Sequence, residues 1–181
     1  IDLQKEFATQ LLTHRNPYTG NRYVDEPALA VQEITNENSL FYLANTDLTL
    51  PVYMEQLHAL WNSWLLERHG DRAGLAKAWT NAEGLCALRA DEDPARGNVE
   101  LPLKHLYADL RDEAYDGPRS PARLNAMTRF LYEVQRDYFQ EMYDHLRSIG
   151  LKCPITGTNQ DFSDASIFAN AVCDFTSRNN Y

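Results

Sequence analysis

Three polar segments, each following a short apolar run, carry the side chains most able to do chemistry in this chain. They are Asn36-Glu37-Asn38, Thr158-Asn159-Gln160 and Asn179-Asn180-Tyr181. Their amides, carboxylate and phenol can make oriented hydrogen bonds as donors and as acceptors. Sugar hydroxyls also donate and accept, so the combination favours a carbohydrate site. Plain polar turns are the alternative interpretation.

The elements around these segments predict that the three come together. Residues 28 to about 35 have the pattern of a strand that is buried on both faces. A second short strand is expected within 151–160, and 173–181 is expected to be a third. The carboxyl ends of parallel strands meet at one edge of a sheet, which is where α/β proteins build their sites.

In most of the remaining chain, apolar residues recur at helical spacing, which predicts helices. The expected helices span 2–14, 53–69, a short stretch after Asp71, about thirty residues from Ser120-Pro121, and part of 161–172. Glycine and proline break any period between 81 and 119, so a long loop with one short helix near 103–110 is expected there. Strands that alternate with helices indicate an α/β fold with a parallel sheet.

Composition limits the partners and cofactors. The 181 residues carry a net charge of −9, which argues against a nucleic-acid partner. No apolar run approaches the ~20 residues of a membrane span, so no membrane partner is expected. Three widely spaced cysteines and five histidines show no metal-ligand spacing. The sequence therefore predicts no metal and no cofactor.

Beyond these general features, three stretches resemble a known family. The stretch LLTHRNPYTGNRYVDEPALAVQEITNENSL, residues 11–40, resembles the third helix through the fourth strand of glycoside hydrolase clan A, and the nearest group is the family five cellulase-like enzymes. RSIGLKCPITGTN resembles the fourth helix and fifth strand, and CDFTSRNNY resembles the sixth strand. The resemblance implies that residues 1–181 are a central segment of a (β/α)₈ TIM-barrel catalytic domain, with 45–119 as a helical and loop insertion.

The resemblance also implies roles for single residues. In the family, an Asn-Glu pair ends the fourth strand; its Glu is the general acid/base and its Asn holds the sugar 2-hydroxyl. These roles carry over to Glu37 and Asn36. The sixth strand of the family usually ends in His-x-Tyr, whereas this chain has Asn179 and Tyr181. We expect both, together with Asn159, to contribute to substrate binding.

The implied activity is hydrolysis of β-linked oligosaccharides or polysaccharides with retention of configuration. Retaining enzymes hold two carboxyl groups about 5 Å apart, and inverting ones up to about 9.5 Å. Glu33 lies four residues before Glu37, which is about 13 Å along an extended strand and too far for either mechanism. By resemblance, the nucleophile is a Glu beyond Tyr181, and this chain alone is expected to be inactive. Relatives are often exported, so a secreted or periplasmic location is implied.

Other interpretations stay open. Asp161 and Asp164 are conceivable bases for an inverting mechanism. A noncatalytic carbohydrate-binding relative would keep the barrel and lose the second carboxylate. A helical interaction module would use residues 51–150 as its binding surface. The tryptophans at 61, 64 and 79 could stack on sugar rings, but their helical spacing favours a place in the core.

Overall fold

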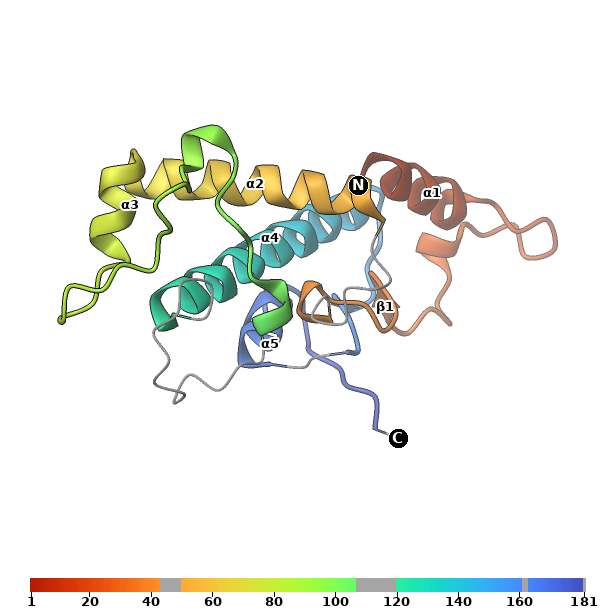
Figure 1. The fold of residues 1–181 in the computed structure, drawn as a ribbon. Helices are drawn as coiled ribbons and strands as arrows, with labels where there is room; N and C mark the ends of the chain where they lie inside the picture. The colour runs from red at the N-terminus through yellow and green to blue at the C-terminus, as the bar shows by residue number, and fades with distance from the viewer. Residues whose placement is uncertain (43–49, 107–119, 161–162, 181) are drawn as a thin grey trace. The chain divides into compact units, whose positions relative to one another are not determined.

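The computed structural model describes residues 1–42, 50–106, 120–160 and 163–180 (Figure 1). The chain forms two compact units, one from Ile1–Leu40 with Tyr132–Tyr181 and one from Phe41–Leu131. The regular elements are α1 (Asp2–Thr13), η1 (Tyr23–Asp25), β1 (Gln32–Glu33), α2 (Pro51–His69), α3 (Arg72–Ala78), η3 (Pro94–Arg96), η4 (Leu103–His105), α4 (Pro121–Ser148), β2 (Ile155–Thr156) and α5 (Asp164–Asn170).

The predicted fold class is wrong. The described residues are mostly helical, and their sheet has only two short parallel strands, so an α/β fold and a partial TIM barrel are both contradicted. The stretch from 28 to 35 contributes only Gln32 and Glu33 to a strand, and Val31 is 56% exposed. An apolar run becomes a strand only where a neighbouring strand pairs with it. The described chain supplies one such partner.

The third strand expected over 173–181 does not form in the described part of that segment, residues 173–180. Residues 174–180 are irregular, although Asp174 N–H donates to Ile155 O at 2.9 Å and Asn179 N–H donates to Asn159 O at 3.0 Å. These single bonds fasten the segment beside β2 without a ladder of alternating bonds. The segment therefore follows β2 as an extended coil.

The helices predicted at 2–14, 53–69, after Asp71, after Ser120-Pro121 and within 161–172 are confirmed, as are their capping signals. Of the helix predicted near 103–110, the structure describes only the short 3-10 helix η4, and residues 107–110 lie outside the described residues. Asp71 Oδ1 accepts from Gly74 N–H at 2.8 Å and begins α3. Ser120 Oγ accepts from Arg123 N–H at 3.3 Å at the start of α4. Gly70 takes a φ of 78° directly after α2, a conformation that glycine adopts without strain. Local hydrogen-bonding chemistry fixes these boundaries, which is why the sequence shows them.

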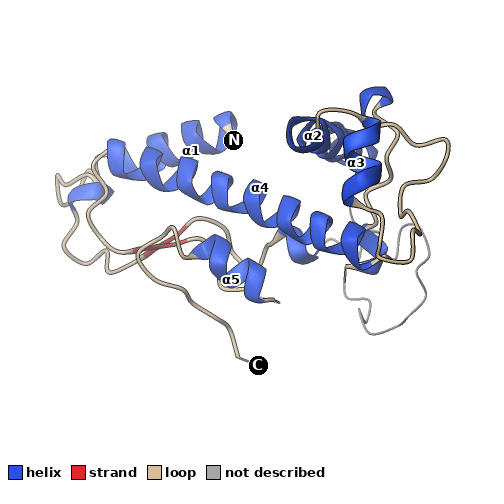
Figure 2. Ribbon diagram, turned by 90° about the vertical axis from the view of Figure 1, so that its left-hand side faces the viewer, coloured by secondary structure: helices blue, strands red, loops and turns tan. Residues whose placement is uncertain are grey.

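The first unit places its short sheet against α4 (Figure 2). Its core joins α1 to the C-terminal half of α4 and to β2 through Leu12, Val24, Leu146, Leu151 and Ile155. A hydrogen bond of 2.9 Å between Thr9 Oγ1 and His145 Nε2 adds a polar contact between the two helices. These contacts give the sheet a fixed support.

The register of the sheet decides which residues meet beyond it. Gln32 pairs with Ile155 and Glu33 with Thr156. Thr35 N–H still donates to Gly157 O at 3.0 Å, so the two segments of the chain remain side by side beyond the ends of β1 and β2. The residues that follow β1 therefore run next to the residues that follow β2.

Gly157 lies where backbone and side chains approach closely. A Cβ at this position would stand 2.6 Å from Asn170 Oδ1 and 2.9 Å from the Phe139 ring. The same Asn170 Oδ1 accepts from Gly157 N–H at 2.7 Å, and Asn170 Nδ2 donates to Thr158 O at 2.9 Å. Helix α5 thus holds the end of β2 through one buried amide.

The second unit packs α2, α3 and the first turns of α4 around aromatic side chains. Trp61 is fully buried and stacks on Trp64, with ring centroids 5.5 Å apart, and on Trp79 at 6.2 Å. Phe130 meets Trp61 edge to face at 5.3 Å. Trp61 and Trp79 are confirmed as core residues, whereas Trp64 is only partly buried.

The second unit also contains a buried ion pair. Arg123 donates to both oxygens of Glu92, at 2.7 and 2.6 Å, and to Glu100 O at 2.6 Å. Glu92 accepts backbone N–H bonds from Arg89 and Glu100, each at 3.0 Å. These bonds satisfy the carboxylate away from water, which is the condition for a buried charge to be tolerated.

Candidate functional site

Glu37 occupies an unusual backbone conformation directly after β1. Residues 34–37 bend instead of extending, and Glu37 has a φ of 47°, which is the left-handed region. Residues with a Cβ adopt this backbone region at an energetic cost, so contacts with the rest of the protein must hold Glu37 there. Its N–H donates to Asn159 Oδ1 at 2.9 Å.

Asn159 joins the segments that follow β1 and β2. Its Nδ2 donates to Asn36 Oδ1 at 2.9 Å and to Glu33 Oε2 at 3.2 Å. Its Oδ1 accepts the N–H of Glu37. The orientation of the amide is fixed, because exchanging its oxygen and nitrogen would set N–H against N–H and oxygen against two oxygens. One side chain therefore holds Glu33, Asn36 and Glu37 together.

Asn179 approaches the same point from the C-terminal coil. Its Nδ2 donates to Glu37 Oε1 at 2.8 Å, and its backbone N–H donates to Asn159 O. Asp174 anchors the coil further back, since its carboxylate accepts the N–H of Ile155 at 2.7 Å. The structure thus brings together four of the five predicted site residues, Asn36, Glu37, Asn159 and Asn179. The fifth, Tyr181, lies outside the described residues.

Glu33 is a second carboxylate near Glu37, although its distance from Glu37 along an extended strand predicts no part in the chemistry. The extended-chain separation of about 13 Å does not apply, because the backbone bends between the two glutamates. Partial burial raises the pKa of Glu33, and the negative charge of Glu37 raises it further. No sequence signal shows this pKa shift, because it depends on the burial of Glu33 in the folded chain and on the bend that brings Glu37 near it.

The donors and acceptors at this site are not all used inside the protein. Asn36 and Glu37 are exposed. Asn36 Oδ1 is engaged by Asn159, and no described residue accepts a hydrogen bond from Asn36 Nδ2. The site therefore offers a bound molecule one amide donor beside a carboxylate.

Of the conceivable inverting bases, Asp164 begins α5 and Asp161 lies outside the described residues.

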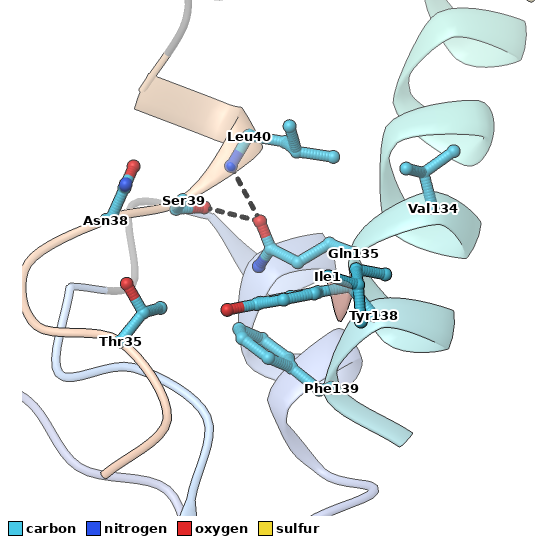
Figure 3. Close-up of a pocket in the computed structure, with 9 residues that line it drawn as sticks. All are labelled: Ile1, Thr35, Asn38, Ser39, Leu40, Val134, Gln135, Tyr138 and Phe139. Carbon is cyan, nitrogen blue, oxygen red and sulfur yellow. Dashed lines mark hydrogen bonds between the residues drawn. The ribbon is translucent and has the colours of Figure 1, made fainter. Parts of the chain in front are cut away.

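A cavity lies beside the segment that leaves the site (Figure 3). It measures about 340 Å³ and is lined by Ile1, Thr35, Asn38, Ser39, Leu40, Val134, Gln135, Tyr138 and Phe139. Gln135 Oε1 accepts from Ser39 Oγ at 2.8 Å and from Leu40 N–H at 2.7 Å. Helix α4 thus fixes the chain immediately after Glu37, while Asn159 fixes it at Glu37.

Comparisons with protein-family models, with curated proteins and with solved structures find no match to this chain. No described helix has both the length and the apolar surface to cross a bilayer. Among the described residues, no three His, Cys, Asp or Glu side chains are grouped in a way that could hold a metal ion.

Proposed function

We propose that this chain carries the acid/base half of a glycoside hydrolase site that acts on β-linked oligosaccharides or polysaccharides. The observation that supports the proposal is the meeting of Asn36, Glu37, Asn159 and Asn179 at one end of a two-stranded sheet. Their sequence context resembles the cellulase-like enzymes. Exposed amides beside a carboxylate suit a ligand rich in hydroxyl groups.

Each residue has a distinct role in this proposal. Glu37 protonates the departing glycosidic oxygen and later takes a proton from the water that releases the sugar. Asn36 turns its amide donor toward a sugar hydroxyl, because its oxygen is engaged by Asn159. Asn179 holds one oxygen of Glu37, which orients the carboxyl group for proton transfer. The nucleophile, a Glu beyond Tyr181, stays a prediction from the resemblance.

The test compares the wild-type full-length protein with Glu37→Gln on aryl β-glycosides that carry good and poor leaving groups. The variant should lose turnover of poor leaving groups by about 100- to 10,000-fold, which is the usual contribution of a general acid. Good leaving groups should still form the glycosyl-enzyme, and azide should restore its release. Glu6→Gln, which changes an exposed glutamate of α1, is the matched control.

A second candidate function is carbohydrate binding without hydrolysis. It is favoured by Asn179, which stands where the resembled family has a His and donates to Glu37 instead. Wild-type protein that binds oligosaccharides but hydrolyses no aryl glycoside would establish this function. Equal turnover by wild type and Glu37→Gln would contradict the acid/base role.

A further inference from the structure

The hydrogen bonds of the Asn159 side chain are all made within the protein. Its oxygen accepts from the backbone of Glu37, and the two protons of its amide nitrogen point to Asn36 and Glu33. An amide engaged at each of these positions has little capacity left to bind a sugar. This differs from the substrate-binding role that the sequence suggests for Asn159.

We propose that Asn159 is a positioning residue that holds Glu37 in its left-handed conformation and sets Glu33 and Asn36 beside it. The catalytic part of this inference rests on the proposed hydrolase function. The positioning part stands on contacts within the chain. An asparagine is suited to the task, because one neutral side chain supplies an acceptor for a backbone N–H and two donors for oxygen acceptors.

The neutrality of Asn159 has its own consequence for the two carboxylates. Glu33 and Glu37 already repel each other, and Asn159 Nδ2 offers Glu33 a donor without adding charge. An aspartate at 159 would keep an acceptor for Glu37 N–H but would lose both donors. It would also place a third negative charge beside Glu33. Asn159→Ala and Asn159→Asp therefore remove different parts of the arrangement.

The first experiment needs no substrate. Backbone amide exchange of Glu37 and the carboxyl ¹³C titration of Glu33 are measured by NMR in the full chain. Asn159→Ala should speed exchange of the Glu37 amide by at least tenfold, whereas Asn159→Asp should keep it protected. The Glu33 titration should move to higher pH in Asn159→Asp. Unchanged exchange at Glu37 in Asn159→Ala would overturn the proposal, whatever the protein hydrolyses.

The control is Asn16→Ala. Asn16 Oδ1 also accepts a backbone N–H, that of Tyr18 at 2.9 Å, but it lies in the turn after α1. Its loss should leave both the Glu37 exchange and the Glu33 titration unchanged. A matching change in Asn16→Ala would mean that general loosening of the fold, and not loss of the Asn159 contacts, is being observed.

The second experiment tests the catalytic consequence on aryl β-glycosides. Asn159→Ala should lower kcat about 100-fold, which is the cost of a misplaced reacting group, with little change in KM. In Asn159→Asp the pH–rate profile should shift to higher pH, because the added charge disfavours ionisation of the neighbouring carboxyl groups. If wild type is inactive, the hydrolase proposal fails alone. If wild type is active and both variants match it in kcat and pH profile, the catalytic inference fails alone.

Discussion

Glu33 is the residue whose ionisation the structure disfavours most plainly near the site. Partial burial and the charge of Glu37 raise its pKa above the ordinary value of 4.5. A group whose pKa is raised by folding holds its proton more firmly in the folded state. The stability that this confers is complete below the pKa of the unfolded chain. It is lost as pH rises through the folded pKa.

This gives a prediction for Glu33→Gln. The substitution keeps an oxygen that can accept from Asn159 and removes the carboxyl group. The midpoint of urea unfolding of wild type should fall as pH rises from about 4 to 7 relative to that of the variant. Glu6→Gln, which neutralises an exposed glutamate, should follow wild type through this range. Parallel pH profiles of wild type and Glu33→Gln would show that Glu33 ionises without hindrance.

At the scale of elements, the sequence predicts best where the cause is local. The start of α3 follows from Asp71, and the start of α4 from Ser120-Pro121, because each cap needs only its neighbours. The strands fail because pairing depends on distant partners. The apolar stretch before Gln32 is compatible with a strand in a large sheet, but the described chain supplies only β2 beside it.

The site shows the same division. Asn36, Glu37, Asn159 and Asn179 can be predicted, because amides and a carboxylate after apolar runs are visible in the sequence. Asn36, Glu37 and Asn159 meet because β1 and β2 pair in parallel register, although the larger expected sheet does not form. Asn179 joins them from the C-terminal coil through its hydrogen bonds to Asn159 and Glu37. The closeness of Glu33 to Glu37 cannot be predicted from the sequence. It depends on the bend at Glu37, whose N–H donates to Asn159, 122 positions away in the sequence.

At the scale of the whole molecule, the two units differ in what holds them. The first unit depends on an apolar core between α1, α4 and β2. The second contains stacked tryptophans and the buried pair of Arg123 and Glu92. Burial opposes ionisation of Glu92, but the bonds from Arg123 and from two backbone N–H groups outweigh it and hold the pKa of Glu92 below its ordinary value.

This pair gives a prediction for Arg123→Met. The substitution leaves Glu92 buried without its cation and should lower the free energy of unfolding by about 3–5 kcal/mol, measured by urea denaturation at pH 7. Adding Glu92→Gln should recover part of this loss. In wild type, the contribution of Glu92 should be lost as pH falls through its lowered pKa, below about 4.5. An Arg123→Met protein as stable as wild type would contradict the role of the pair.

Because Glu37 has a left-handed backbone conformation, the residue that would be most stable at this position differs from the residue that the proposed catalysis needs. Glycine adopts this conformation without the penalty of a Cβ, so the free energy of unfolding of Glu37→Gly should exceed that of Glu37→Ala, which also lacks the Asn179 contact, by up to about 1 kcal/mol. Thermal unfolding of Glu37→Gly and of Glu37→Ala, which keeps the Cβ, would measure this difference in stability. A glycine variant that melts below the alanine variant would contradict the prediction. A laboratory population screened only for heat tolerance would then drift toward glycine at this position. It would discard the general acid/base of the proposed hydrolysis.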